Sequence, residues 1–198
     1  AFREMYARSV EDNEGFWREQ AGRIDWFTPF ETVKDVSYAS DDVRIQWYVG
    51  GKTNACHNAL ARPVDAGTGG KTALIFEPDD PNTQETLHLT YREVYENVCR
   101  LTNALRAMGV KKGDRVTVYL PMIPEAAYTM RACSRVGAIH SVVFAGFSPD
   151  SLATRILDCD SDFVGTADQG RRGGRTVARK QNVDKATQTY IKKNLLQP

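Results

Sequence analysis

The alternation of apolar and polar positions predicts most elements in the second half of the chain. Short apolar runs with the length of buried strands occur at 115–120 (RVTVYL), 139–144 (IHSVVF) and 162–166 (DFVGT). Two helices are predicted between them, because proline suits the first turn of a helix: one opens at Pro124 and is closed by Gly137, and the other has Ser148 as its N-cap and Pro149 at its first position. The order strand–helix–strand–helix–strand with short links predicts an α/β fold. We expect a partly parallel sheet with helices on both faces.

A long helix over 91–108 has the clearest local signature. Thr90 and Glu93 have the spacing of a capping box, in which each residue binds the backbone amide of the other. Gly109 stands where a helix commonly ends in a left-handed residue. Apolar residues recur between these ends with helical spacing at Val94, Val98, Leu101, Leu105 and Met108.

Ahead of this region, aromatic residues predict a helical and aromatic arm. Residues 11–20 are expected to form a short helix with Phe16 and Trp17 on its apolar side. The aromatic residues around Pro29 are expected to pack on one another, since large aromatic side chains dominate buried area. Residues 41–48 alternate apolar and polar positions, which predicts a strand with one buried face.

A β-hairpin and a domain boundary are predicted between the arm and the long helix. The apolar runs 73–76 and 86–89 flank a polar stretch with two prolines, as in a hairpin with a long loop. The glycine-rich stretch 65–70 separates the hairpin from the arm. We therefore place the N-terminal arm and helical or strand segment at 1–65, and the first part of an α/β domain at 66–198.

Composition excludes several classes of partner. Lysine and arginine number 26 and aspartate and glutamate 25, giving a net charge of +1, so we expect no nucleic-acid partner. No run of about 18 apolar residues predicts a membrane span, and the opening residues AFREMYARSV lack the apolar core of a signal peptide. The cysteines form no C-x-x-C pair and suit a reducing cytosol, so we expect a cytoplasmic protein. They are Cys56, Cys99, Cys133 and Cys159.

Two segments at strand ends are the candidate binding sites, because ligands of open parallel sheets bind at the carboxyl ends of strands. The first is 145–149, which follows the strand ending at Phe144 and contains a glycine that lets a ligand approach the backbone closely. The second is the loop 170–175, whose arginines match phosphate oxygens. Taken alone, this second loop predicts either a phosphate site or a solvated surface. The candidate residues are Phe144, Ala145, Gly146, Arg172, Gly173, Gly174 and Arg175.

Other residues whose side chains could take part in catalysis are expected to have structural roles instead. Cys56 and His57 are adjacent, and adjacent residues of a helix point to different faces, which argues against a catalytic pair. His140 lies in an apolar strand and is expected to be a hydrogen-bonded core histidine. Asp79 and Asp80 are expected to form a solvated turn. The segment GTGGK lacks the spacing of a phosphate-binding P-loop.

Four stretches of the sequence resemble the acetyl-CoA synthetases, a family of the acyl-adenylate-forming (AMP-binding) superfamily. They lie at 16–33, 45–62, 111–156 and 166–186. The most specific block is PMIPEAA followed by VGAIHSVVFAGFSP, which separates short-chain acyl-CoA synthetases from most other adenylating enzymes. The resemblance implies the N-terminal part of the adenylate-forming enzyme fold, preceded by the arm and the β-hairpin.

The resemblance also implies the reaction of an AMP-forming acetate–CoA ligase. In that reaction acetate attacks the α-phosphate of Mg-ATP, giving acetyl-AMP and pyrophosphate, and the thiol of CoA then displaces AMP. In such enzymes the CoA nucleotide lies against the segment matching Phe144, Ala145 and Gly146, and its phosphates meet the arginines matching Arg172 and Arg175. The expected small molecules are acetate, ATP, CoA and Mg²⁺, with the ATP and Mg²⁺ sites mostly outside this chain.

Some features depart from the family pattern. Ala145 stands where glycine is usual, so its methyl group is expected to crowd the adenine side of CoA. Gln169 replaces a usual glutamate, and Gly165 takes a strand position usually held by a bulky apolar residue, which should weaken that strand. The family's Ser/Thr/Gly-rich phosphate loop and catalytic lysine have no counterpart here. We therefore assign no catalytic residue and no metal ligand, and expect an inactive N-terminal fragment.

Two alternatives stay open at the level of sequence. One alternative is a fragment of a propionyl-CoA synthetase, because the acyl-pocket residues that separate the two enzymes are not in this chain. A stand-alone, non-catalytic module that binds CoA or another nucleotide would need only the two strand-end segments. The sequence does not predict the oligomeric state.

Overall fold

The structure is a computed structural model that describes residues 1–80, 82 and 85–195, with side chains described as far as residue 189. The chain divides into two compact units, Ala1–Asn54 and Ala55–Pro198. All the candidate binding residues lie in the second unit. Among the helices that the described residues form, none has the length and apolar character needed to cross a bilayer.

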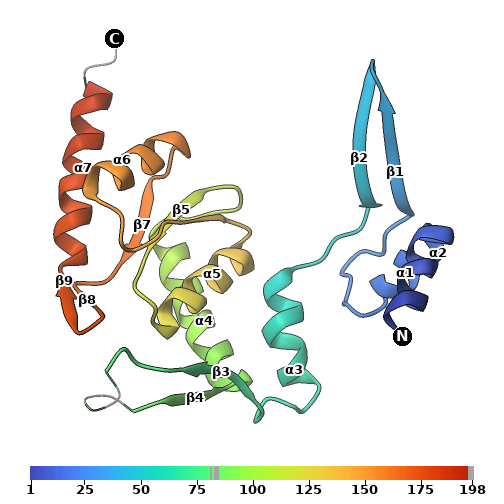
Figure 1. The fold of residues 1–198 in the computed structure, drawn as a ribbon, viewed down its shortest axis with the longest axis horizontal. Helices are drawn as coiled ribbons and strands as arrows, with labels where there is room; N and C mark the ends of the chain where they lie inside the picture. The colour runs from blue at the N-terminus through green and yellow to red at the C-terminus, as the bar shows by residue number, and fades with distance from the viewer. Residues whose placement is uncertain (81, 83–84, 196–198) are drawn as a thin grey trace. The chain divides into compact units, whose positions relative to one another are not determined.

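The first unit joins two helices to a two-stranded hairpin (Figure 1). The Asp12 carboxylate caps the second helix by accepting a hydrogen bond from the Gly15 amide at 3.2 Å. The ring centroids of Trp26, Phe30 and Tyr48 lie 5.0 to 5.3 Å apart, which confirms the predicted aromatic packing. The elements are α1 (Phe2–Glu11), α2 (Asn13–Ala21), β1 (Thr32–Ala39) and β2 (Asp42–Val49), with β1 and β2 antiparallel.

The strand predicted at 41–48 forms, but the prediction that one of its faces is buried is wrong. Within the first unit, Val43, Ile45 and Trp47 keep 71, 58 and 40% of their surface exposed. A two-stranded hairpin has no second layer of its own to cover its apolar side chains. Helix α2 packs near the base of the hairpin, where the ring centroids of Trp17 and Trp47 lie 6.0 Å apart.

The centre of the second unit is a three-stranded parallel sheet in the order β6–β5–β7. In its register, Val116 pairs with His140 on one side and with Phe163 on the other, which confirms the predicted parallel strands. His140 is exposed, so its expected place in the core is wrong. The reason is that β6 is an edge strand of this sheet. The strands are β5 (Arg115–Tyr119), β6 (Ile139–Val142) and β7 (Phe163–Thr166).

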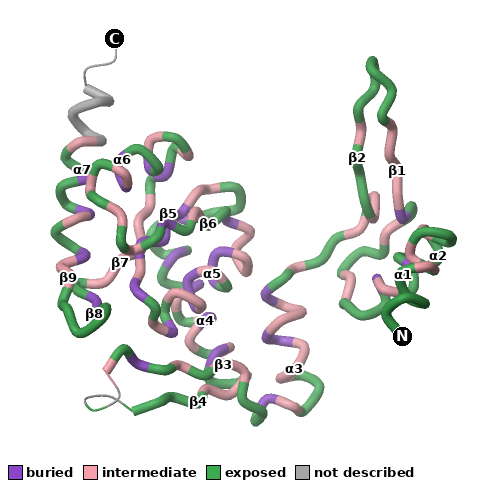
Figure 2. The backbone as a smooth tube through the Cα atoms, viewed as in Figure 1, coloured by how far each residue is buried: buried purple, intermediate pink, exposed green. Residues whose placement is uncertain are grey.

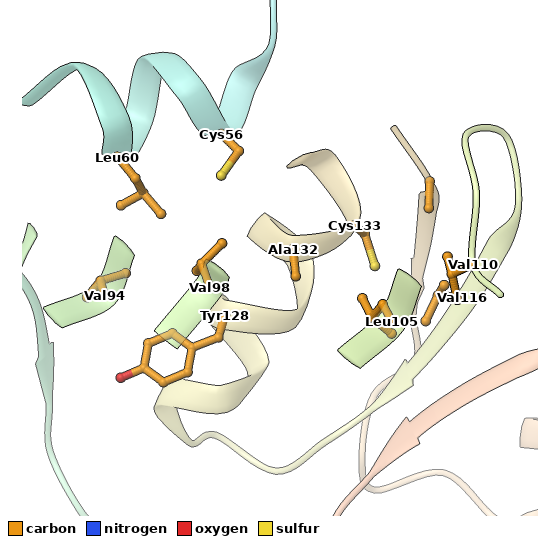
Figure 3. Close-up of a cluster of buried hydrophobic side chains, with 11 residues drawn as sticks. Cys56, Leu60, Val94, Val98, Leu105, Val110, Val116, Tyr128, Ala132 and Cys133 are labelled. Atoms are coloured by element: carbon orange, nitrogen blue, oxygen red, sulfur yellow. The ribbon is translucent and has the colours of Figure 1, made fainter. Parts of the chain in front are cut away.

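Helices cover both faces of the sheet, as predicted. Val116 belongs to a core cluster with Val98 and Cys133 from the helices on one face (Figure 3). Tyr119 belongs to a second cluster with Leu152 from the other face. Buried residues concentrate along β5 and on the helices around it (Figure 2). The first face carries α4 (Tyr91–Ala107) and α5 (Pro124–Val136), and the second carries α6 (Pro149–Asp158) and α7 (Arg179–Leu195).

The signals that predicted helix ends are confirmed at the level of single hydrogen bonds. The Thr90 hydroxyl accepts from the Glu93 amide at 3.2 Å, and the Glu93 carboxylate accepts from the Thr90 amide at 2.8 Å. Gly137 ends α5 with a φ of 86°, a left-handed conformation that suits glycine. The Ser148 hydroxyl accepts from the Ser151 amide at 3.3 Å at the start of α6.

Two hairpins complete the second unit, one predicted and one not. The predicted hairpin forms from antiparallel β3 and β4. The basic segment 170–175, predicted as a loop, is a second hairpin, because Gly173 and Gly174 provide a two-residue turn with positive φ at both positions. The remaining elements are η1 (His57–Ala61), α3 (Arg62–Asp65), β3 (Thr72–Phe76), β4 (Leu87–Thr90), β8 (Gly170–Arg172) and β9 (Arg175–Val177).

Candidate functional site

The turn after β6 is fixed at the carboxyl end of the sheet by partly buried hydrogen bonds. Tyr119, fully buried at the end of β5, donates its hydroxyl proton to the Phe147 carbonyl at 2.9 Å. Asn182 of α7 donates to the same hydroxyl oxygen at 3.2 Å. The Phe147 amide donates to the Phe144 carbonyl at 3.0 Å and closes the turn. Residues 144–147 are therefore held by both β5 and α7.

Two arginines stack on the two phenylalanines of this turn. The guanidinium carbon of Arg172 lies 4.9 Å from the centre of the Phe144 ring, and that of Arg155 lies 4.4 Å from the centre of the Phe147 ring. The two rings meet edge to face with centroids 5.5 Å apart. Phe144 still keeps 54% of its surface exposed, so this surface combines an accessible aromatic ring with two positive charges.

Gly146 lies close to the Phe144 ring of its own turn and to the Arg172 side chain of the second hairpin. A Cβ atom at this position would lie 2.5 Å from Cε1 of Phe144 and 3.0 Å from Nη1 of Arg172. Both distances are too short for a side chain to fit without moving its neighbours. The structure therefore brings Phe144, Gly146 and Arg172, which come from the two candidate segments, close together.

The hairpin β8–β9 presents its arginines on two different faces. Arg172 and Arg175 are partners in the register, so their side chains project from the same face, whereas Arg171 projects from the other. Arg171 forms an ion pair with Asp80 at 3.4 Å. Within the described part of the chain, neither Arg172 nor Arg175 forms an ion pair, so both guanidinium groups are available to an anion.

The amides of the Gly173–Gly174 turn are already engaged by a carboxylate. The Gly173 amide donates to Oδ1 of Asp79 at 2.9 Å, and the Gly174 amide donates to Oδ2 at 3.0 Å. These bonds lower the pKa of Asp79 below its ordinary value, the Gly174 bond having the larger effect. Asp79 is exposed, as expected for a solvated turn, but both aspartates also bind the hairpin, which the sequence did not predict.

A buried arginine lies close to the base of the same hairpin. Arg179 keeps only 2% of its surface exposed, and its guanidinium carbon lies 5.8 Å from the centre of the Tyr119 ring. A Cβ atom at Gly170 would lie 3.3 Å from its Nε atom, which has no hydrogen-bond partner among the described residues. Arg179 thus adds positive charge at the carboxyl ends of the strands.

Some of these site residues were predicted from sequence and others were missed. Ala145 packs against the second core cluster together with Phe147, so its methyl group has a place in the core. Asp79 and Arg155 were missed. Asp79 lies in a polar stretch 94 positions away from Gly173, and nothing in its local sequence distinguishes it from a solvated loop residue. Among the residues that the structure describes, no three acidic, histidine or cysteine side chains gather as a metal site.

Comparison with known proteins gives the family to which this chain belongs. Residues 62–196 match the family of AMP-binding enzymes, and residues 2–59 match the N-terminal region of acetyl-coenzyme A synthetase. Because the first match covers most of the chain, the chain belongs to the AMP-binding enzyme family.

Two bacterial relatives similar to this chain are acetyl-coenzyme A synthetases. One from Methylorubrum populi is 57% identical over 185 residues, covering 93% of this chain and 28% of that protein. One from Brucella canis is 54% identical over 193 residues, covering 98% of this chain and 29% of that protein. The chain therefore spans less than a third of the length of these relatives.

A solved structure has a similar fold over nearly the whole length of this chain. The acetoacetyl-CoA synthetase from Streptomyces lividans matches with a TM-score of 0.80 and 26% sequence identity. The match covers 93% of this chain and 28% of that protein. The fold of this chain is thus that of the corresponding portion of an adenylate-forming enzyme.

Proposed function

We propose that this chain supplies part of the CoA-binding site of an AMP-forming acetate–CoA ligase. The observation that carries the proposal is the guanidinium group of Arg172, which stacks on the Phe144 ring beside the exposed Gly146. An aromatic face suits a nucleotide base, a bare glycine backbone allows close approach, and unpaired guanidinium groups suit phosphates. Arg175 supplies a second such group from the same face of the hairpin.

The overall reaction proposed for the longer protein has two steps. Acetate attacks the α-phosphate of ATP and releases pyrophosphate, and the sulfur of CoA then attacks the acetyl carbon of acetyl-AMP and releases AMP. Magnesium, when bound with ATP, offsets the negative charge of its phosphates. We assign no residue of this chain to either bond change. Its residues bind and orient the nucleotide end of CoA, which leaves the thiol free to reach acetyl-AMP.

Kinetics of the full-length protein test this proposal because the two steps can be measured separately. Arg172→Ala and Arg175→Ala should each raise the KM for CoA by about 10- to 100-fold, since a charge-assisted phosphate contact contributes about 1.5–3 kcal/mol. Exchange of pyrophosphate into ATP, which reports acetyl-AMP formation, should change by less than about twofold. Equal losses in both assays would contradict the proposal.

Two further variants separate stacking from charge. Arg172→Lys keeps the positive charge but loses the planar group, so its KM for CoA should lie between those of the wild type and Arg172→Ala. Arg100→Ala serves as the matched control, because Arg100 is exposed on α4 and makes only surface contacts, with Asn97 at 2.9 Å and Glu96 at 3.7 Å. That control should leave both assays unchanged.

A further inference from the structure

The tip of the hairpin that carries Arg172 and Arg175 is held by a residue from a distant part of the chain. Asp79 follows β3, and its two carboxylate oxygens accept separate hydrogen bonds from the amides of Gly173 and Gly174 at 2.9 and 3.0 Å. The two glycines have φ angles of 55° and 74°, so successive amides turn toward the same anion. The loop after β3 extends toward this hairpin tip in Figure 1.

A second contact holds one face of the hairpin against the same loop. Arg171 forms its ion pair with Asp80 at 3.4 Å, whereas Arg172 projects from the opposite face toward Phe144. The hairpin is thus bound by Asp79 at its tip and by Asp80 on one face. Its free face is left with the two arginines that have no acidic partner among the described residues.

We infer that Asp79 is a positioning residue for CoA, which fixes the Gly173–Gly174 turn so that Arg172 and Arg175 face the ligand. The inference rests on the proposed CoA site and adds a residue to it that touches no ligand. Because the Asp79 carboxylate occupies both turn amides, the phosphates of CoA meet the arginine side chains rather than these amides. The opposite possibility is that the carboxylate competes with phosphate for the amides. In that case removing the carboxylate would lower the KM for CoA instead of raising it.

Asp79→Asn in the full-length protein is the main test. The amide oxygen of asparagine satisfies one turn amide, while its NH₂ group opposes the other, so the turn should loosen without losing volume. The KM for CoA should rise about five- to tenfold, while kcat at saturating CoA and pyrophosphate exchange change by less than about twofold. A merely structural defect would instead lower kcat and pyrophosphate exchange. Glu96→Gln, which removes an exposed carboxylate on α4, is the matched control.

Combining the substitution with Arg172→Ala separates failure of this inference from failure of the proposed site. If Asp79 acts through Arg172, then Asp79→Asn should add less than about twofold to the KM of the Arg172→Ala variant. An Arg172→Ala variant with an unchanged KM for CoA would overturn the CoA site itself. An effect of Arg172→Ala without any effect of Asp79→Asn would overturn the role of Asp79 alone.

Two further measurements of the KM for CoA would distinguish a positioning carboxylate from a competing one. A fall in the KM for CoA in Asp79→Asn would show that the carboxylate competes with the ligand, and would overturn the positioning role. Asp79→Glu retains the carboxylate, so its KM should lie between those of the wild type and Asp79→Asn even if the latter folds poorly. An Asp79→Glu variant with a higher KM than Asp79→Asn would also count against the inference.

Discussion

The guanidinium group of Arg172 stacks on the ring of Phe144 with 4.9 Å between the guanidinium carbon and the ring centre. The two residues come from different strand ends, one after β6 and the other in β8. The contact therefore joins the two segments that the sequence singled out as separate anion sites. It also makes the geometry of each segment depend on the other, which is the basis of the first prediction.

Gly146→Ala should weaken CoA binding by disturbing this contact. The added Cβ would lie 2.5 Å from Cε1 of Phe144 and 3.0 Å from Nη1 of Arg172, so the ring and the guanidinium must move apart. We expect the KM for CoA to rise about tenfold, while pyrophosphate exchange stays within about twofold of wild type. Steady-state kinetics of the full-length protein measure both quantities.

Gly70→Ala is the matched control for this substitution. A Cβ at Gly70 would meet no atom within 4 Å, so the same chemical change is made in open space. Its KM for CoA should not change. Equal effects of the two substitutions would mean that Gly146 has no special role.

The contact between Asp79 and the hairpin should be lost in acid. Hydrogen bonds from the Gly174 and Gly173 amides lower the pKa of the Asp79 carboxyl. A group with a lowered pKa contributes stability above its ordinary pKa, about 3.9 for aspartate, and loses that contribution as pH falls through the lowered value. The amide NMR signals of Gly173 and Gly174 should therefore shift with a midpoint below about 3.9. Asp79→Asn should abolish this transition, and a midpoint above the ordinary value would contradict the assignment.

Local sequence signals predicted the elements of the second unit because those elements depend on nearby residues. The Thr90 and Glu93 cap, the left-handed Gly137 and the Ser148 cap each act within one helical turn, and each forms as expected. The burial of His140 was predicted wrongly, because the number of strands beyond β6 is a property of the sheet and not of the strand.

The site could be predicted only in part, for a similar reason. The glycines and arginines at the strand ends predicted an anion site, because their conformational freedom and charge are properties of single residues. The hairpin form of 170–175 was missed, although the Gly173–Gly174 pair is a known signal for a two-residue turn. The Asp79 contact spans 94 positions, and no periodicity or motif joins two segments so far apart.

Gly165→Ala should stabilise the protein. Gly165 lies inside β7, where a Cβ would sit 3.7 Å from Cγ2 of Thr129 and 3.9 Å from the Thr117 carbonyl oxygen, which are ordinary contacts. Replacing a strand glycine with alanine should raise the free energy of unfolding by about 0.5–1 kcal/mol, because the unfolded chain loses freedom. Thermal unfolding measures this change as a higher Tm.

Gly137→Ala provides the contrasting control for Gly165→Ala. Its φ of 86° is strained for alanine, and a Cβ would lie 3.0 Å from Cγ of Lys112. This variant should lower the Tm, since the same substitution now meets an incompatible backbone. Two variants with shifts of the same sign would contradict the backbone argument.

The four cysteines should react with an alkylating reagent in two groups, because the thiolate is the reactive form. Burial raises the pKa of the Cys133 thiol to about 11, and burial also raises the pKa of Cys56. Both lie fully buried in the first core cluster, whereas Cys99 and Cys159 are half-buried. Iodoacetamide at about pH 8 should therefore label Cys99 and Cys159 first, as followed by peptide mass spectrometry. In guanidinium chloride all four should react alike, which serves as the unfolded control. Early labelling of Cys133 in the folded protein would show that the core cluster around Val116 is accessible to the reagent.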